Sequence, residues 1–208
     1  MRPDDHRDGA GLFRNLVPLV LASASPRRRE LLSLLGLEFE VFPAEVEEAI
    51  QPGKPPEDLV KELAQRKALA VAEQFPEAAI LAGDTLVVKG RDLLGKPRGP
   101  EEAYRMLMAL SGLWHRVLTA VCIVYKNEKK VFITETAVKF RKLLPEEIRA
   151  YIGTGEPLDK AGAYALQGLA SAFVERIEGS VTGVIGLPLS ETVEALLKWN
   201  LITPVKDG

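Results

Sequence analysis

The sequence predicts an α/β fold in which helices flank a mixed, twisted sheet. Strand-like and helix-like segments alternate in the first half of the chain, two long β-rich runs follow, and a helical segment comes near the end. A chain of 208 residues suits one domain that buries roughly 70% of the surface its unfolded chain exposes. We therefore expect a flexible N-terminal extension over residues 1–15 and a single domain over residues 16–208.

The first expected elements are a buried strand, a tight turn and the start of a helix. Residues 16–22 are almost entirely apolar, which is typical of a strand buried on both faces. Ser25 suits the N-cap of the helix that follows, Pro26 suits its first position, and Gly36 suits its end.

Four more segments complete the first half of the chain. Residues 37–42 alternate apolar and acidic side chains, as a half-exposed strand does, and residues 44–56 are an acidic, proline-rich loop. A long amphipathic helix is predicted over residues 57–74. A second apolar strand is predicted over residues 78–88, with an interruption at residues 83–85.

The second half is predicted to contain a hairpin between helices. Residues 115–125 and 130–140 are β-rich and joined by a polar turn, which indicates an antiparallel hairpin. This hairpin favours a mixed sheet over a parallel one. The other expected elements are helices at 100–110 and 145–151, a glycine- and charge-rich loop at 153–168, short strands at 172–177 and 184–187, and a last helix from Ser190 to Trp199.

Composition excludes several classes of protein. The chain has 27 Lys and Arg against 29 Asp and Glu, a net charge of −2, whereas nucleic-acid-binding domains usually carry a strongly basic face. The single cysteine, Cys122, lies in an apolar run, which predicts a buried hydrophobe rather than a reactive thiol. No apolar stretch approaches the roughly 20 residues of a membrane span. We expect a cytoplasmic protein without nucleic-acid or membrane partners.

Residues 21–29 (LASASPRRR) have the features of a phosphate-binding turn. Small residues let a ligand approach the backbone, and the N–H groups of a helix N-terminus favour an anion. Arginines add paired donors for phosphate oxygens. The alternative is a solvated basic start of a helix. Ser23 and Ser25 have no histidine partner in the sequence pattern, so no serine nucleophile is predicted.

Asp84 and Lys96 are further candidates for the same chemistry. Asp84 is flanked by apolar residues on both sides, and a carboxylate is costly to bury without a partner. It could activate water or hold Mg²⁺, or merely satisfy the backbone of a bulge. Lys96 follows a glycine in a loop and suits a polyphosphate, although a turn with a surface lysine is the simpler interpretation.

The segment over residues 155–168 concentrates charged residues, glycines, an aromatic residue and an amide. Asp159 could join Asp84 around a metal, Tyr164 could stack on a ring or pack beneath one, and Gln167 could read the edge of a base. The alternative is an ordered surface loop. Glu48, in the acidic loop, could add a carboxylate, although such loops are usually only solvated.

These candidates combine several cations with two or three carboxylates and contain no covalent nucleophile. Such a set suits the Mg²⁺-assisted hydrolysis of a polyphosphate by activated water. It does not choose the substrate.

The motifs resemble, in order, those of the Maf (septum-formation) family of nucleoside triphosphate pyrophosphatases. The resemblance covers roughly residues 19–201. It implies an α/β protein with two lobes and a deep cleft, forming a homodimer. It also implies hydrolysis of a nucleoside triphosphate between the α- and β-phosphates with a divalent cation, Mg²⁺ or Mn²⁺. The matching segments are LASASPRRRELL, the Glu47-Glu48 region, the Gln65-Arg66-Lys67-Ala68 helix, GDTLVV, LGKP, LSG with the following VLTAV, ETAVKF, EPLDKAGAYALQG and IEGS with GLPLSET.

The resemblance also assigns roles by motif. Asp84 matches the proton acceptor and, with Glu48, the metal-binding carboxylates, and Lys96 joins them as a catalytic cation. Substrate contacts are implied for the remaining matched positions: Ser23, Arg27, Arg28, Lys67, Thr85, Asp159 and Gln167.

Three of these positions differ between the subfamilies of the family that the chain resembles. Arg27, Thr85 and Gln167 resemble the branch that hydrolyses dTTP and UTP, whereas the 7-methyl-GTP branch resembles Trp, Gln and Glu there. Two alternatives remain, a 7-methyl-GTP pyrophosphatase and a nucleotide-sensing regulator of septum formation.

The chain departs from the family at Ala82-Gly83, where Gly-Ala is more usual, and at residues 181–183.

Overall fold

The computed structural model describes residues 11–46 and 53–205. Over these residues, seven strands form one sheet in the order β3-β2-β4-β6-β7-β8, with β5 paired to β4. Strand β2 is parallel to β3 and β4, and the other pairs are antiparallel. This confirms the mixed sheet. The strands are β2 Leu19–Leu21, β3 Glu40–Val41, β4 Ala79–Lys89, β5 Asp92–Leu94, β6 Trp114–Tyr125, β7 Glu128–Phe140 and β8 Val174–Glu178.

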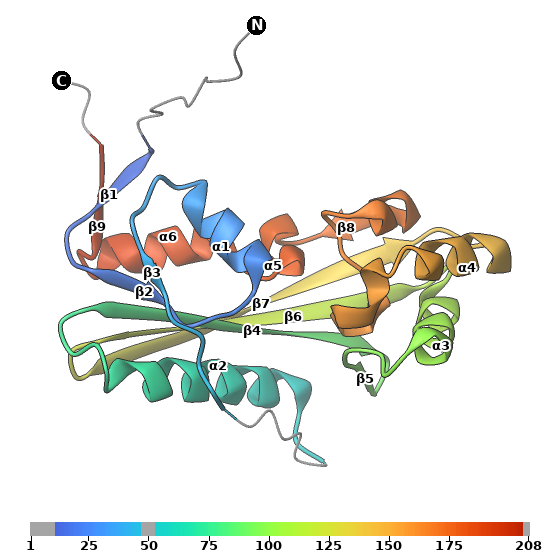
Figure 1. Cartoon of the computed structure of the whole chain (residues 1–208), viewed down its shortest axis with the longest axis horizontal. Coiled ribbons are helices and arrows are strands. Elements are labelled where there is room, and N and C mark those ends of the chain that lie inside the picture. The colour runs from blue at the N-terminus through green and yellow to red at the C-terminus, as the bar shows by residue number, and fades with distance from the viewer. Residues whose placement is uncertain (1–10, 47–52, 206–208) are drawn as a thin grey trace, which may run out of the picture.

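Helices cover both faces of one end of this sheet (Figure 1). Helix α2 (Pro56–Ala72) packs on one face, while α1 (Pro26–Ser33) and α6 (Leu189–Lys198) pack on the other. Because side chains alternate along a strand, Ile80 faces α2 and Leu81 faces the opposite layer. We call this end the helix-covered lobe.

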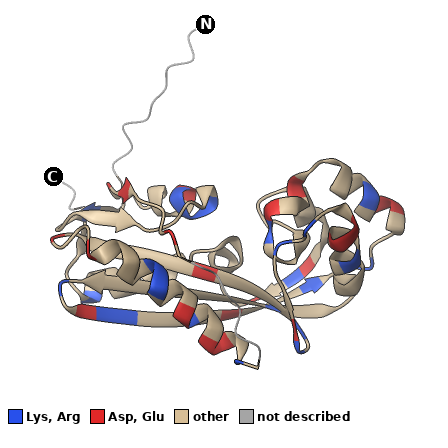
Figure 2. Cartoon of the chain, turned by 60° about the horizontal axis from the view of Figure 1, so that its bottom comes forward, with Lys and Arg blue, Asp and Glu red and all other residues tan. Residues whose placement is uncertain are grey.

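The long strands β4, β6 and β7 continue into a second lobe (Figure 1). There a third core cluster forms between the sheet, α3 (Pro100–Leu110), α4 (Pro145–Gly153) and the second and third of three short 3₁₀ helices. The 3₁₀ helices are Glu156–Asp159, Ala161–Ala163 and Leu169–Phe173. The sheet therefore joins two lobes, and charged residues of both signs occur in both of them (Figure 2).

Two strands near the chain ends were not expected from the sequence. Strand β1 (Phe13–Asn15) pairs antiparallel with β9 (Ile202–Pro204) in a separate two-stranded sheet. The expected flexible extension over residues 1–15 is therefore too long, because its last residues form backbone hydrogen bonds in this sheet. Residues 1–10 lie outside the described part of the chain.

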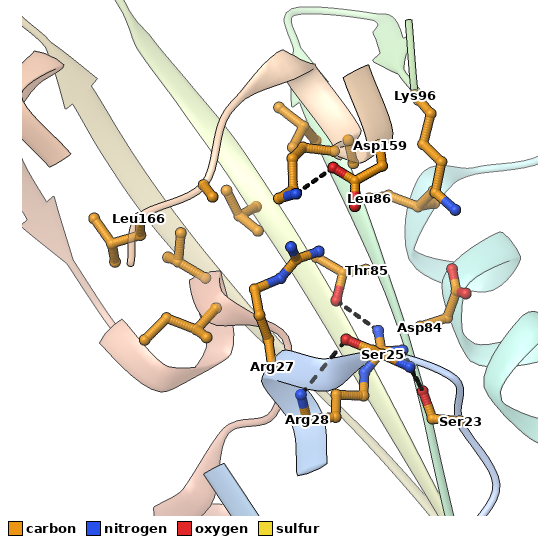
Figure 3. A pocket seen from close by; sticks show the side chains of 18 of the residues that line it. Ser23, Ser25, Arg27, Arg28, Asp84, Thr85, Leu86, Lys96, Asp159 and Leu166 are labelled. Carbon is orange, nitrogen blue, oxygen red and sulfur yellow. Dashed lines mark hydrogen bonds and ion pairs between the residues drawn. The ribbon is translucent and has the colours of Figure 1, made fainter. Parts of the chain in front are cut away.

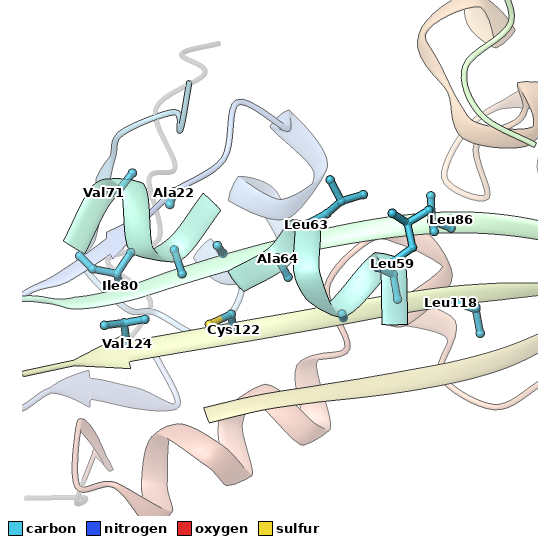
Figure 4. Packing of buried hydrophobic residues seen from close by; sticks show 14 of the residues in the cluster. Ala22, Leu59, Leu63, Ala64, Val71, Ile80, Leu86, Leu118, Cys122 and Val124 are labelled. Carbon is cyan, nitrogen blue, oxygen red and sulfur yellow. The ribbon is translucent and has the colours of Figure 1, made fainter. Parts of the chain in front are cut away.

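Local signals placed several elements correctly. Ser25 is the N-cap of α1 with Pro26 at its first position, as predicted, and α3 covers the expected residues 100–110. Cys122 is fully buried beneath α2 (Figure 4), and this burial raises its pKa to about 11. This confirms the prediction of a buried, unreactive thiol.

Other local signals were misleading. The strand expected at 184–187 is wrong, because α5 (Val181–Ile185) occupies this region, with the Ser180 hydroxyl accepting from the Gly183 N–H. Strand β4 runs through Asp84 without interruption. The last helix begins after Pro188 rather than at Ser190. Of the helices in the described ranges, none is long and apolar enough to cross a membrane.

Candidate active site

A pocket of about 500 Å³ opens between the two lobes (Figure 3). Its size lies within the roughly 300–1,000 Å³ usual for small-molecule sites. One side, the strand wall, consists of residues 23–28 with Lys67, Asp84 and Thr85. The opposite side, the loop wall, consists of pocket-lining residues from the 3₁₀ segment: Asp159, Lys160, Ala161, Tyr164, Ala165 and Leu166.

The start of α1 brings polar groups to the strand wall. The Ser25 hydroxyl caps the helix by accepting from the Arg28 N–H at 3.5 Å. The Ser23 hydroxyl oxygen accepts from the Ser25 N–H at 3.2 Å, which ties the preceding turn to the helix. A helix N-terminus with short polar side chains is a favourable site for an anion.

Asp84 is held on the strand wall by a buried ion pair. The Lys67 ammonium donates to its carboxylate at 2.6 Å, and the two side chains are only 12% and 11% exposed. Asp84 comes from β4 and Lys67 from α2, one helical turn after Leu63, which also lines the pocket. The pairing supplies the partner that a buried carboxylate requires.

Arg28 connects the strand wall to neighbouring segments. Its Nε donates to the Gly186 carbonyl at 2.8 Å, its Nη1 to the Ser23 hydroxyl at 3.1 Å, and its Nη2 to Thr85 Oγ1 at 3.1 Å (Figure 3). A Cβ at Gly83 would lie 3.2 Å from Arg28 Nε. The glycine at this position therefore gives the guanidinium room to lie against the sheet.

Charged side chains face one another across the pocket. Arg27 extends from α1 toward the side that carries Asp159 (Figure 3). Asp159 forms an ion pair with Lys160. Partial burial acts to raise the pKa of Asp159, but Lys160 and then Arg27 outweigh it and hold the pKa below its ordinary value.

A buried aromatic pair supports the loop wall from behind. The Tyr164 hydroxyl and His115 Nε2 lie 2.9 Å apart, and the His115 ring packs edge-on against Phe140 and Tyr164. Burial lowers the pKa of His115 to about 4 and raises that of Tyr164. His115 is thus a structural side chain whose ring stays neutral near pH 7.

The described lining carries five cationic and two acidic side chains, an excess of positive charge that suits a polyanion. The cations are Arg27, Arg28, Lys67, Lys96 and Lys160, and the acids are Asp84 and Asp159.

Comparisons with known proteins identify the family of the chain. The sequence model of the family described as Maf-like protein matches residues 18–199. The chain belongs to this family. A relative from Anaeromyxobacter dehalogenans, named dTTP/UTP pyrophosphatase, is 54% identical over 89% of this chain and 96% of its own length. A relative of the same name from Hahella chejuensis is 48% identical over 88% and 92%. The solved Ham1 protein of Staphylococcus aureus is 14% identical over 88% of this chain and 99% of its own, with a TM-score of 0.48.

In this Maf-like protein, most of the site residues expected from the sequence meet in one pocket. Gln167 does not, since its side chain is exposed and is not among the residues that line the pocket, although the preceding Leu166 is. Glu48 lies outside the described residues. The residues brought together are Ser23, Arg27, Arg28, Lys67, Asp84, Thr85, Lys96 and Asp159.

Lys160 is a site residue that sequence reasoning missed. Its side chain is only 13% exposed, lines the pocket and pairs with Asp159. The available signal was a lysine directly beside an acidic residue in a glycine-rich segment. Lys67 was found only through the family resemblance, and its signal is a cation on the apolar stripe of α2.

The pocket offers carboxylate oxygens that could contact a divalent cation. Within residues 11–46 and 53–205, no three His, Cys, Asp or Glu side chains converge as a metal cage. Mg²⁺ is usually held by one or two carboxylates together with substrate phosphates and water, whereas zinc needs several protein ligands. Asp84 offers such a carboxylate inside the pocket.

Proposed function

We propose that this Maf-like protein hydrolyses dTTP and UTP to the nucleoside monophosphate and pyrophosphate. The observation that carries the proposal is the buried Lys67–Asp84 pair in a pocket whose charged residues are mostly cationic. The relatives that share about half of its residues and carry the name dTTP/UTP pyrophosphatase support the choice of substrates.

In the proposed reaction, Asp84 acts as a general base. Its carboxylate takes a proton from a water molecule, whose oxygen attacks the α-phosphorus. The bond between the α-phosphorus and the oxygen bridging to the β-phosphate breaks, and pyrophosphate leaves. The 2.6 Å contact from Lys67 fixes the orientation of the carboxylate for this step.

The cations and the turn before α1 would hold the triphosphate. Ser23, Arg28, Lys67 and Lys96 line the pocket around Asp84. The Ser23 hydroxyl can donate to a phosphate oxygen, and the positive charge of the other three stabilises the negative charge that develops on the phosphates. Asp84, with Glu48 from the acidic loop, would hold Mg²⁺ or Mn²⁺. Such an ion offsets phosphate charge when it is bound.

Selection of the base is assigned to Arg27, Thr85 and Gln167. The first two line the pocket, and Gln167 follows Leu166 at the edge of the loop wall. The paired donor and acceptor of an amide match the adjacent carbonyl and N–H of uracil or thymine. We further propose a cytoplasmic homodimer that has no nucleic-acid partner.

The test is pyrophosphate release from UTP, dTTP, CTP, GTP and 7-methyl-GTP with Mg²⁺ or Mn²⁺. We expect preference for UTP and dTTP and loss of turnover in EDTA. Asp84→Asn should lower kcat by about a thousandfold with the fold intact, since it removes the base but keeps the shape. Tight nucleotide binding without release would instead support the nucleotide-sensing alternative. Preference for 7-methyl-GTP would overturn the assigned substrates.

A further inference from the structure

A line of hydrogen bonds runs from the pocket into the interior of the sheet. Arg28 Nη2 contacts Thr85 Oγ1 at 3.1 Å, and Thr85 Oγ1 contacts Thr119 Oγ1 at 3.0 Å. Thr119 Oγ1 then donates to the Gly183 carbonyl at 2.8 Å. The line therefore starts at a cation of the strand wall and ends in helix α5.

The chemistry of the groups fixes the direction of each bond. The Gly183 carbonyl can only accept, so the one hydroxyl proton of Thr119 points to it. The Thr85 hydroxyl must then donate to Thr119, and Arg28 donates to Thr85. As a result, the Thr85 hydroxyl can only accept from groups on the pocket side, and an Arg28 N–H satisfies it there.

Thr119 itself is placed out of reach of a substrate. It lies on β6 opposite Thr85, is 1% exposed and is not among the residues that line the pocket. Its neighbours on the strand, Leu118 and Ala120, are fully buried apolar residues. A buried hydroxyl costs free energy unless it is hydrogen-bonded, so valine would be the simpler residue for packing alone.

Helix α5 is hydrogen-bonded to Arg28 as well as to Thr119. Arg28 Nε donates to the carbonyl of Gly186, which follows α5, while Thr119 donates to the carbonyl of Gly183 within it. A Cβ at Gly186 would lie 3.6 Å from Arg28 Nε and 3.7 Å from Thr85 Oγ1. Arg28 and Thr119 thus hold the same short helix from two sides.

We propose that Thr119 is a positioning residue for the hydrolysis described above, on which this inference rests. Its hydroxyl fixes the rotamer of Thr85, which in turn holds the Arg28 guanidinium beside Ser23 and the neighbouring Asp84. Misplacement of a charged group by about 1 Å is enough to cost roughly a hundredfold in rate. Such a displacement weakens interactions that are made in the transition state, so it should change kcat more than KM.

The matched comparison uses two buried threonines on adjacent strands. Thr136 is also 1% exposed, and its Oγ1 accepts from the Ser180 N–H and donates to the Ser180 carbonyl, with no contact to Arg28 or Thr85 among the described bonds. We expect Thr119→Val to lower kcat for UTP about tenfold, with KM changed less than about threefold. Thr119→Ser should restore kcat, and Thr136→Val should leave it within about twofold of wild type.

A double-mutant cycle separates a shared line of bonds from independent effects. In a Thr85→Val background the line is already broken, so adding Thr119→Val should lower kcat no further. Thr119→Ala carries the same expectation as the valine variant and replaces it if that variant does not fold. Equal kcat in Thr119→Val and Thr136→Val, or full additivity with Thr85→Val, would overturn the inference. A wild-type protein that releases no pyrophosphate would refute the proposed function instead.

Discussion

The two walls of the pocket are built in different ways. The strand wall rests on a long strand, two helices and a set of side-chain hydrogen bonds around Arg28. The loop wall rests on short 3₁₀ turns, where Gly162 has a φ of 67° and Ala163 a φ of 60°. Precise geometry is easier to hold on regular elements, and loops tolerate variation. From this difference we infer that the strand wall positions the groups for the chemical step, whereas the loop wall adapts to the bound substrate.

Removing a charge from the strand wall should have the largest effect. Lys67→Met leaves the Asp84 carboxylate without its partner at 2.6 Å, and we expect kcat to fall at least about a hundredfold. Unfolding by urea should show a loss of about 2–4 kcal/mol. Adding Asp84→Asn should recover the stability but not the activity, since the unpaired charge is gone. A Lys67→Met protein of wild-type stability would show that this pair does not organise the wall.

The contribution of His115 to the loop wall can be tested by measuring the free energy of unfolding at different pH values. Burial lowers the pKa of His115 from 6.5 to about 4, so between these values the unfolded chain binds a proton that the folded chain does not. Stability due to the neutral ring is therefore present above pH 6.5 and is lost as pH falls toward 4, by up to roughly 3 kcal/mol.

The matched variant for this test is His115→Gln, which keeps a polar group near Tyr164. Urea midpoints at pH 7.5 and pH 4.5 should differ less in this variant than in the wild type, because the titrating ring is absent. An unchanged difference would mean that another group carries the pH dependence. Activity should follow stability here, because His115 does not line the pocket.

Loosening the loop wall should affect substrate binding more than turnover. One Glu156 carboxylate oxygen accepts from the Tyr151 hydroxyl at 2.9 Å and the other from the Leu169 N–H at 3.0 Å, which closes the loop that carries Asp159 and Tyr164. Glu156→Gln converts one acceptor to a donor. We expect KM for UTP to rise about fivefold with kcat nearly unchanged. A fall in kcat without a change in KM would reverse the roles of the two walls.

The smallest effect is expected at the outer edge of the loop wall. Gln167 is exposed, whereas Thr85 is half-buried in the strand wall. We expect Gln167→Glu to lower kcat/KM for UTP about threefold and Thr85→Gln to lower it at least about tenfold. The measurement is the same nucleotide panel for both variants. The opposite order would make Gln167, rather than Thr85, the main contact for base recognition and imply that the loop moves on binding.

Sequence reasoning identified most of the pocket because its groups sit in short local patterns. A capping serine and a proline mark the start of α1, and an isolated Asp84 in an apolar strand signals an unusual carboxylate. The contacts between these patterns could not be read locally, since the Lys67–Asp84 pair joins a helix to a strand. Likewise, the apolar residues 184–187 resembled a strand until the Ser180 cap and the packing of α5 decided otherwise.

The pairing of β1 with β9 has a consequence for how the protein is made. Phe13 lies opposite Pro204, and the Val205 N–H donates to the Leu12 carbonyl at 3.0 Å, so a strand near the first described residues needs one near the last to complete its pairing. During synthesis the chain grows from its amino end. The small sheet can therefore close only after residues 202–204 have left the ribosome, and until then strand β1 remains an open edge. Strands β1 and β9, which lie side by side in Figure 1, therefore join a segment made early in synthesis to one made about 190 residues later.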